Sequence, residues 1–366
     1  MVRISLFAVV TACSYTPPRD QAPTDADQDG AVNDAPPVVR CFGTFKKVCL
    51  ENPPTSAFTL GGADNSVITE MQSNCVTTTN ESTVASSCVI AGSSVTIDGS
   101  LTASGGVPLV IVATDGELII ENLLDVSSRR GDERRGAGAN PTGACNGATG
   151  ATDGAGGAGG SFGGKGGTGG RGLTGNAPAA AAALAFPNQL RGGCPGNLSG
   201  RPTGALAIGS GGGAVWLIST VGITINGTVN ASGSGGSGAD GGLVARGGAG
   251  GGTGGMIILD APTITVAQNG VLLATGGGGG GNNIGLITGG DGENPDPESP
   301  DQPAGGGSAM TSRRVATVAS RAMARRAIAT SSRPGAVVAA APASSARSAR
   351  STHRERCCRR SRRASC

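Results

Sequence analysis

The stretch Ile223-Thr224-Ile225-Asn226-Gly227-Thr228-Val229-Asn230-Ala231-Ser232 decides the fold of this chain. Its residues alternate between apolar and polar, and successive side chains of a β-strand point to opposite faces. We therefore expect an inward-facing set made of Ile223, Ile225, Val229 and Ala231. The outward set is then Thr224, Asn226, Thr228 and Asn230. Gly227 has the inward parity, which marks a corner that needs a small residue with free φ.

The same pattern recurs along the chain. Segments that begin at Val110, Val215 and Met256 align without a gap over eighteen positions, and the third then takes two extra residues, which keeps the parity. A half-copy around Val95 precedes the first, about one coil of a three-faced β-helix before the matching Leu118. The other inward residues expected are Val95, Ile97, Leu101, Ala103, Leu118, Ile120, Leu124, Val126, Ile264, Val266, Leu272 and Ala274. Repeated strands without helices predict an all-β fold, a right-handed parallel β-helix or solenoid with long glycine-rich loops.

Glycine dominates the region between these copies. Of the 67 glycines, 56 lie between residues 136 and 307. The tract from Gly156 to Arg171 repeats paired glycines every three residues, which suits polyproline II helices that pack laterally where side chains are absent. A disordered glycine loop is the alternative, because ordering glycine costs conformational entropy.

The N-terminus predicts an export signal. A short basic start and an apolar run lead to Val10-Thr11-Ala12-Cys13, which resembles a bacterial lipobox with Cys13 as the lipidated residue. We expect a lipoprotein signal peptide over 1–13, anchored in the outer membrane or at the cell surface. Residues 14–40 form an Asp- and Pro-rich flexible tether. Within it Asp25, Asp27 and Asp29 match half of a calcium loop, with a solvated acidic linker as the alternative.

Six further cysteines precede residue 200, and an exported chain meets an oxidising compartment. The disulfide candidates are Cys41, Cys49, Cys75, Cys88, Cys145 and Cys194. Sequence order suggests the pairs 41–49, 75–88 and 145–194, although fifteen connectivities are possible. A zinc site is the weaker alternative, because this part of the chain has no C-x-x-C pair and no histidine.

The charge divides the chain in two. Residues 1–308 carry 14 Lys and Arg against 24 Asp and Glu, whereas residues 309–366 carry 14 Arg against Glu355 alone. The acidic part excludes a basic nucleic-acid face. We expect a disordered tail over 291–366, with residues from about 309 arising from a frameshift, since glycine codons read out of frame give alanine and arginine. A genuine basic tail that binds nucleic acid or anionic lipid is the alternative.

The remaining boundaries follow from composition. We expect a cysteine-bearing N-terminal solenoid part over 41–128, a glycine-rich insertion over 129–210 and C-terminal solenoid repeats over 211–290. The lipobox, the tether and the motifs Cys41-Phe42-Gly43, Cys88-Val89-Ile90-Ala91-Gly92 and Thr96-Ile97-Asp98-Gly99-Ser100-Leu101 resemble uncharacterised glycine-rich lipoproteins of myxobacterial type. That resemblance implies a surface protein and carries over no catalytic residue.

Catalysis has one candidate pair. Asp98 and Glu121 hold equivalent positions in successive copies, and carboxylates one strand apart could serve glycoside hydrolysis. Asn226 holds the same position later, however, and Asp98-Gly99 and Asn226-Gly227 are typical turn dipeptides. We therefore expect no enzyme activity and no cofactor beyond the calcium of the half-motif. The expected function is a structural or adhesive surface protein whose partners are the membrane, a polysaccharide or neighbouring solenoids, with a carbohydrate-active β-helix enzyme as the alternative.

Overall fold

The computed structural model describes residues 38–60, 65–69, 75–84, 86–131, 134–145, 147–185, 187–200, 206–283, 285–308 and 336–338. Contacts divide the chain into two units, residues 1–37 and 38–366, and all described residues belong to the second. The described part is all-β and contains no helix. Lipidation at Cys13 and calcium binding by Asp25, Asp27 and Asp29 lie outside the described residues.

The strands are short, and most have three to five residues. Their bounds are β1 Val39–Phe42, β2 Val48–Glu51, β3 Phe58–Leu60, β4 Asn65–Ile68, β5 Cys88–Gly92, β6 Val95–Ile97, β7 Ser100–Ser104, β8 Leu109–Ala113, β9 Leu118–Ile120, β10 Leu123–Asp125, β11 Ala214–Ser219, β12 Ile223–Ile225, β13 Thr228–Asn230, β14 Met256–Asp260, β15 Ile264–Val266, β16 Val271–Leu273 and β17 Ala336–Val338.

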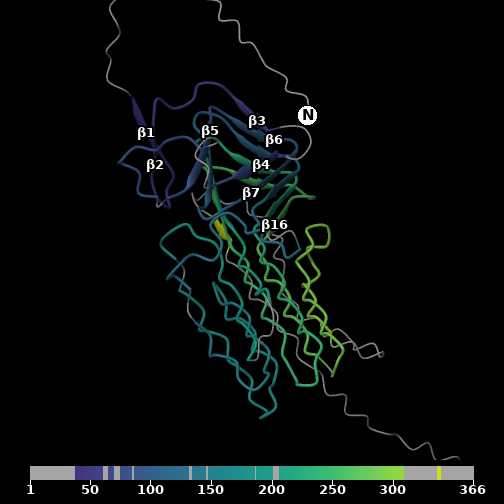
Figure 1. Cartoon of the computed structure of the whole chain (residues 1–366). Coiled ribbons are helices and arrows are strands. Elements are labelled where there is room, and N and C mark those ends of the chain that lie inside the picture. Colours follow the sequence, from purple (N-terminus) through teal and green to yellow (C-terminus); the bar gives the residue numbers. More distant parts are fainter. Residues whose placement is uncertain are drawn as a thin grey trace, which may run out of the picture. The chain divides into compact units, whose positions relative to one another are not determined.

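From β3 onwards, every third strand joins the same sheet. Figure 1 shows β6 beside β3 and β7 beside β4. Sheet 1 has the order β15-β12-β9-β6-β3, sheet 2 the order β16-β13-β10-β7-β4, and sheet 3 the order β17-β14-β11-β8-β5. All pairings within these sheets are parallel except that of β17 with β14. The chain thus passes through sheets 1, 2 and 3 in the same order, one passage beside the next.

The predicted inward parity is confirmed. Ile223, Ile225, Val229 and Ala231 are at most 1% exposed and belong to one apolar cluster that draws residues from all three sheets. The equivalents in the two preceding passages are fully buried as well. In the last passage Ile264, Val266 and Leu272 are only half-buried, because no described strand follows them in sheets 1 and 2.

Three details of the expected repeat are wrong. In sheet 3 Val110 pairs with Trp216 and not with Val215, because the connection to sheet 1 differs by one residue between passages. An ungapped alignment of the two copies would shift this strand by one residue and assign its inward side chains to the outer face. Asn230 is buried although the alternation places it on the outer face, and its Oδ1 accepts a hydrogen bond from Ser232 N at 3.1 Å. Glycine is required at position 227 because the backbone of Asn122 lies too close for a side chain, and its φ is not positive. A Cβ there would lie 1.8 Å from the carbonyl oxygen of Asn122.

In sheet 3 the strands β5, β8, β11 and β14 are buried on both faces, which suits parallel strands with continuous apolar sequences. Its outer face packs against Phe42, Val48 and Leu50 of the antiparallel β1–β2 hairpin, which the sequence analysis did not anticipate. The hairpin loop reaches β14, where Thr44 Oγ1 donates to Asp260 at 3.0 Å. Trp216 fills the space below Gly43, so this hairpin ties the first passage to the last.

The glycine-rich segments are ordered by backbone hydrogen bonds. In Figure 1 they run side by side as extended traces from teal to yellow-green. Gly233, Gly236 and Ala239 donate in turn to Thr275, Gly278 and Gly281 on a neighbouring segment. This period of three is the repeat of the polyproline II helix. Residues between these donors bond to other neighbours, as Ser234 N does to Ser210 O, so each segment is held from several sides.

Residues 291–308 belong to this glycine-rich part, so the boundary expected at 291 has to move. Gly292 N donates to Gly236 O, and Gly307 N donates to Gly279 O. Beyond residue 308 only β17 is described, which pairs antiparallel with β14 at the end of sheet 3.

Candidate functional site: a polar hollow beside the first hairpin

Two disulfide-closed segments form the walls of a hollow near the start of sheet 3. Cys41 and Cys49 face each other across β1 and β2 and are bonded, which fixes the end of β2. The Cys75–Cys88 disulfide closes the second segment onto β5. Backbone hydrogen bonds from Val76 N to Val89 O and from Thr79 N to Cys49 O hold this segment against both strands. The walls are therefore held in place before any ligand arrives.

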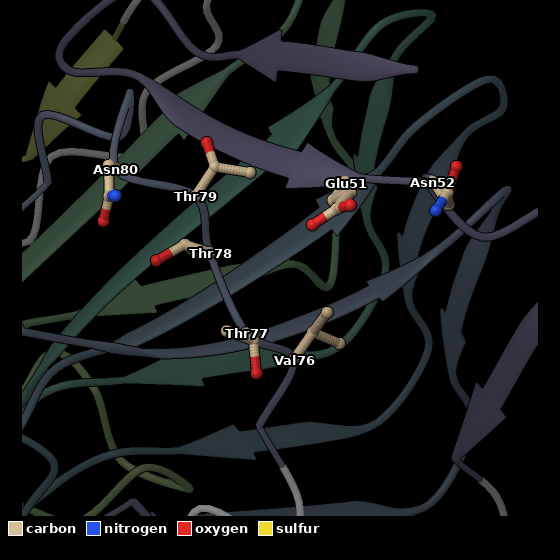
Figure 2. Close-up of a pocket in the computed structure, with 7 residues that line it drawn as sticks. All are labelled: Glu51, Asn52, Val76, Thr77, Thr78, Thr79 and Asn80. Carbon is tan, nitrogen blue, oxygen red and sulfur yellow. The ribbon is translucent and has the colours of Figure 1, made fainter. Parts of the chain in front are cut away.

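The hollow, whose lining residues are drawn in Figure 2, has a volume of about 520 Å³ and is mainly polar. This volume lies in the range of small-molecule sites. Its lining consists of Glu51, Asn52, Val76, Thr77, Thr78, Thr79 and Asn80. The carboxylate of Glu51 is the only charged group among them, so the hollow favours hydroxyl or amino groups and disfavours anions.

Two residues of the lining have unusual local states. Asn52 has a φ of 54°, a left-handed conformation that is uncommon outside glycine, and its N–H donates to Val38 O. Thr79 Oγ1 is buried without a hydrogen-bond partner in the described part of the chain. Backbone outliers and unsatisfied polar atoms gather at functional sites, so both support this hollow as a site.

The outer face of sheet 1 offers a second polar surface. Thr59, Thr96, Thr224 and Thr265 share one column with Ile119 between the second and third. Their side chains are half-buried to exposed, and adjacent strands are spaced by about 4.8 Å. The column is a row of hydroxyl and methyl groups at a regular interval.

The candidate carboxylate pair lies at the turns between sheets 1 and 2. Asp98 and Glu121 follow the paired residues Ile97 and Ile120, so they occupy neighbouring passages. Both are exposed, and Glu121 Oε2 accepts a hydrogen bond from Asn226 Nδ2 at 2.9 Å. The pair does not line the hollow. Asp98, Glu121 and Asn226 therefore form a row of polar residues at equivalent turns of successive passages.

A buried ion cluster lies where sheet 2 meets the glycine-rich part. Asp125 is 2% exposed and accepts from Arg134 Nη2 at 2.6 Å, while Arg129 lies at 3.5 Å. Arg130 then pairs with Asp291 at 2.7 Å, which links this loop to the last glycine-rich segment. Each carboxylate already has its cation, so the cluster is a structural connection.

The three disulfides have the pairing that sequence order suggested: Cys41–Cys49, Cys75–Cys88 and Cys145–Cys194. Among the described residues Cys41, Cys49 and Glu81 form the one group with metal-like spacing, but both sulfurs are already bonded to each other. The residues of the hollow were missed by sequence reasoning. A signal was present, since Thr77-Thr78-Thr79-Asn80 is a polar run between two cysteines.

Comparison with family models, curated proteins and solved structures finds no match to this chain. Within the described residues, no helix has the length and apolar character needed to cross a membrane.

Proposed function

We propose that this chain is a lipid-anchored outer-membrane or cell-surface protein with a structural or adhesive role and no catalytic activity. Its strand part would be a right-handed parallel β-helix, which three parallel sheets visited in strict rotation support. The three disulfides fit an exported protein. The resemblance to glycine-rich lipoproteins of myxobacterial type supports the same location.

The observation that carries the adhesive role is the threonine column on sheet 1. A row of hydroxyl and methyl groups at strand spacing can hydrogen-bond and contact an extended, hydroxyl-rich polymer along several repeats. The neighbouring Asp98 and Glu121 give this face negative charge, so neutral or amino-bearing polysaccharides would fit better than uronates. A neighbouring copy of the chain is the other occupant that the proposal allows.

Binding of the full chain to insoluble neutral, amino-bearing and acidic polysaccharides tests this role. We expect neutral or amino glycans to retain the protein and a Thr96→Ala/Thr224→Ala variant to lose most of that retention. Thr174→Ala is the matched control, because this exposed threonine lies in the glycine-rich insertion. Equal retention of all variants would reject the column as the binding face. Turnover of a glycan that Asp98→Asn abolishes would replace the adhesive role by glycoside hydrolysis.

Fatty-acid labelling and protease accessibility test the proposed lipid-anchored location. In cells that express the full chain, we expect labelled fatty acid on the protein and its digestion by protease added outside. Cys13→Ser should remove the label and release the protein. An unlabelled wild-type chain in the soluble fraction would reject the anchored location.

We also propose that the arginine-rich tail, from about residue 309, is the product of a frameshift. Two earlier glycine-rich excursions end directly in strands of sheet 3, at β11 after Gly213 and at β14 after Gly255. The third excursion reaches Ser308, where the composition changes. Resequencing the gene tests this: another frame after codon 308 should encode an apolar strand and further glycine tracts, and their absence would reject it.

A further inference from the structure

Two of the three disulfides have neighbours of opposite charge. Beside Cys41–Cys49, an oxygen of the Glu81 carboxylate lies 3.9 Å from Cys41 Sγ. Beside Cys145–Cys194 the neighbour is the Arg191 guanidinium. A negative neighbour disfavours a thiolate and a positive neighbour favours it, so these two bonds should differ in reactivity.

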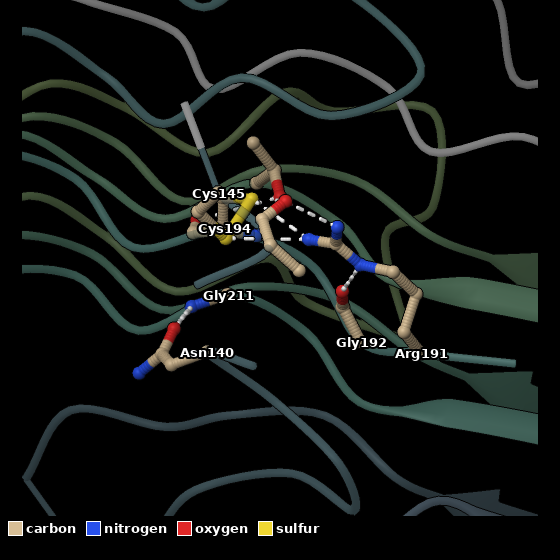
Figure 3. Close-up of a disulfide and its surroundings, with 8 residues drawn as sticks. Asn140, Cys145, Arg191, Gly192, Cys194 and Gly211 are labelled. Carbon is tan, nitrogen blue, oxygen red and sulfur yellow. Dashed lines mark hydrogen bonds between the residues drawn. A yellow bond between two sulfur atoms is a disulfide. The ribbon is translucent and has the colours of Figure 1, made fainter. Parts of the chain in front are cut away.

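Arg191 is directed at both sulfurs of its disulfide (Figure 3). Its Nη2 lies 3.2 Å from Cys145 Sγ and 3.1 Å from Cys194 Sγ. The guanidinium is held there by three other contacts. Nε donates to Gly192 O at 3.3 Å, Nη1 donates to Ala144 O, and the group stacks over the Phe162 ring at 4.9 Å.

No carboxylate neutralises this guanidinium among the described residues, where the ion pairs involve Arg40, Arg129, Arg130 and Arg134. Burial lowers the pKa of Arg191, yet an arginine side chain stays protonated in proteins. Its positive charge therefore acts on the two sulfur atoms and on any anion that approaches them.

The two sulfurs differ in access. Cys194 is 2% exposed, whereas Cys145 is half-buried. An external thiolate therefore reaches Cys145 Sγ first, and Cys194 Sγ becomes the leaving atom. The leaving thiolate would stay in hydrogen-bond reach of Arg191, and a stabilised leaving thiolate departs faster.

We propose that Cys145–Cys194 is a thiol-exchange site that reacts with low-molecular-weight thiols. A thiolate RS⁻ attacks Cys145 Sγ, the Cys145–Cys194 bond breaks, and RS–Cys145 forms with Cys194 as thiolate. A second RS⁻ then attacks the RS sulfur, so that RSSR forms and Cys145 leaves as a thiolate. The disulfide gains two electrons from the two thiols, which are oxidised to RSSR.

Thiol exchange at Cys145–Cys194 would remove the covalent cross-link that closes the glycine-rich insertion. The bond joins residues 49 positions apart in sequence, and the segment between them carries Phe162 and Leu190, which pack on the outer face of sheet 3. Cys194 itself lies among the ordered glycine segments, since its N–H donates to Thr253 Oγ1 at 2.9 Å. Opening the bond leaves the insertion held by non-covalent contacts, which include these and backbone hydrogen bonds such as that from Gly160 N to Gly251 O.

Timed reduction of the full chain with glutathione, followed by alkylation and peptide mass spectrometry, tests the proposal. We expect Cys145–Cys194 to open first, about tenfold faster than Cys41–Cys49, with glutathione attached to Cys145 as the first product. Arg191→Met keeps an aliphatic side chain over Phe162 but removes the charge, and it should slow opening of this bond about tenfold. Arg171→Met is the matched control, an exposed arginine of the same insertion.

The direction of the rate change in Arg191→Met distinguishes loss of thiolate stabilisation from loosening of the insertion. A substitution that merely loosened the insertion would expose the disulfide and speed its opening, so faster opening in Arg191→Met would overturn the proposal. Equal opening rates for all three bonds in the wild-type chain would overturn it too. A second readout is the pH dependence of Cys194 alkylation after reduction, where Arg191→Met should shift the midpoint to higher pH.

Discussion

The strand part and the glycine-rich part of this protein are both tightly packed, but by opposite means. In the strand part large side chains such as Leu217 and Ile97 are fully buried between three sheets. In the glycine-rich part the packing atoms are backbone atoms, and a Cβ on Gly255 would lie 1.7 Å from the carbonyl oxygen of Gly213. One part is stabilised by burial of apolar side chains, and the other by close approach of hydrogen-bonded backbones.

This difference predicts opposite responses to side-chain size. Removing atoms should damage the strand part, because cavities cost free energy there. Adding atoms should damage the glycine-rich part wherever its backbones approach closely, because a side chain has no space at those glycines.

Leu217→Ala should have the largest effect. Leu217 is fully buried in β11, so its truncation should lower the free energy of unfolding by about 2–5 kcal/mol. Urea unfolding of the full chain measures this. Leu243→Ala is the control in the glycine-rich part, since Leu243 is 89% exposed and its truncation should change stability by no more than about 0.5 kcal/mol. Equal losses for both would contradict the contrast.

Gly252→Ala should cost about 3 kcal/mol through overpacking, although it adds a single methyl group. A Cβ at Gly252 would lie 1.9 Å from the carbonyl oxygen of Ser210, and Gly252 N also donates to Ser234 O. Gly147→Ala is the matched control, because nothing lies within 4 Å of its Cβ position. Thermal and urea unfolding compare the two. A stable Gly252→Ala chain would show that the segments can move apart freely.

Asp125→Ala should destabilise the connection between the two parts by about 2 kcal/mol, because Arg134 loses its charged acceptor. Asp291→Asn is the comparison at the exposed end of the same connection. It keeps the acceptor for Gly238 N but loses the charge that faces Arg130, and exposed pairs contribute about 0–1 kcal/mol. We expect added salt to reduce the effect of Asp291→Asn and to leave that of Asp125→Ala nearly unchanged.

Asp115→Asn should have the smallest effect and a pH signature. Hydrogen bonds from Arg40 and Thr114 lower the pKa of Asp115 below its ordinary 3.8. The ionised carboxylate therefore adds stability above pH 3.8, and this contribution is lost as the pH falls through the lower folded pKa. The wild-type chain should be slightly more stable than Asp115→Asn at neutral pH, and the difference should vanish in acid. A pH-independent difference in melting temperature would contradict this account.

Sequence reasoning identified the strand part well. The alternation around Ile223 and Val229 predicted which side chains are buried, since parity alone assigns the faces of a strand. The order of the cysteines suggested the three disulfide pairs that the structure shows, among fifteen possible connectivities. The period of three in the glycine tract fitted polyproline II helices, but a disordered loop had the same sequence signal.

Sequence reasoning missed features that depend on distant segments. The pairing of Trp216 with Val110 depends on the length of a turn and not on hydropathy, because every residue of both strands is buried. The hollow arises where the end of β2 meets a loop beyond residue 75, and no local pattern predicts that meeting. Arg191 was unremarkable in sequence, yet it lies against both sulfurs of a disulfide.

By itself the sequence determined the all-β class and the inward residues of the strands, because these follow from local alternation along the chain. The order of the six cysteines suggested their pairing but left fifteen connectivities open. Only the tertiary structure decided that the glycines form a hydrogen-bonded array, since Gly233 and Thr275 or Gly252 and Ser234 become partners through three-dimensional contact alone. It likewise decided the surroundings of each disulfide. A charge acts through distance in space, and the chain brings Arg191 and Glu81 to different sulfurs by folding.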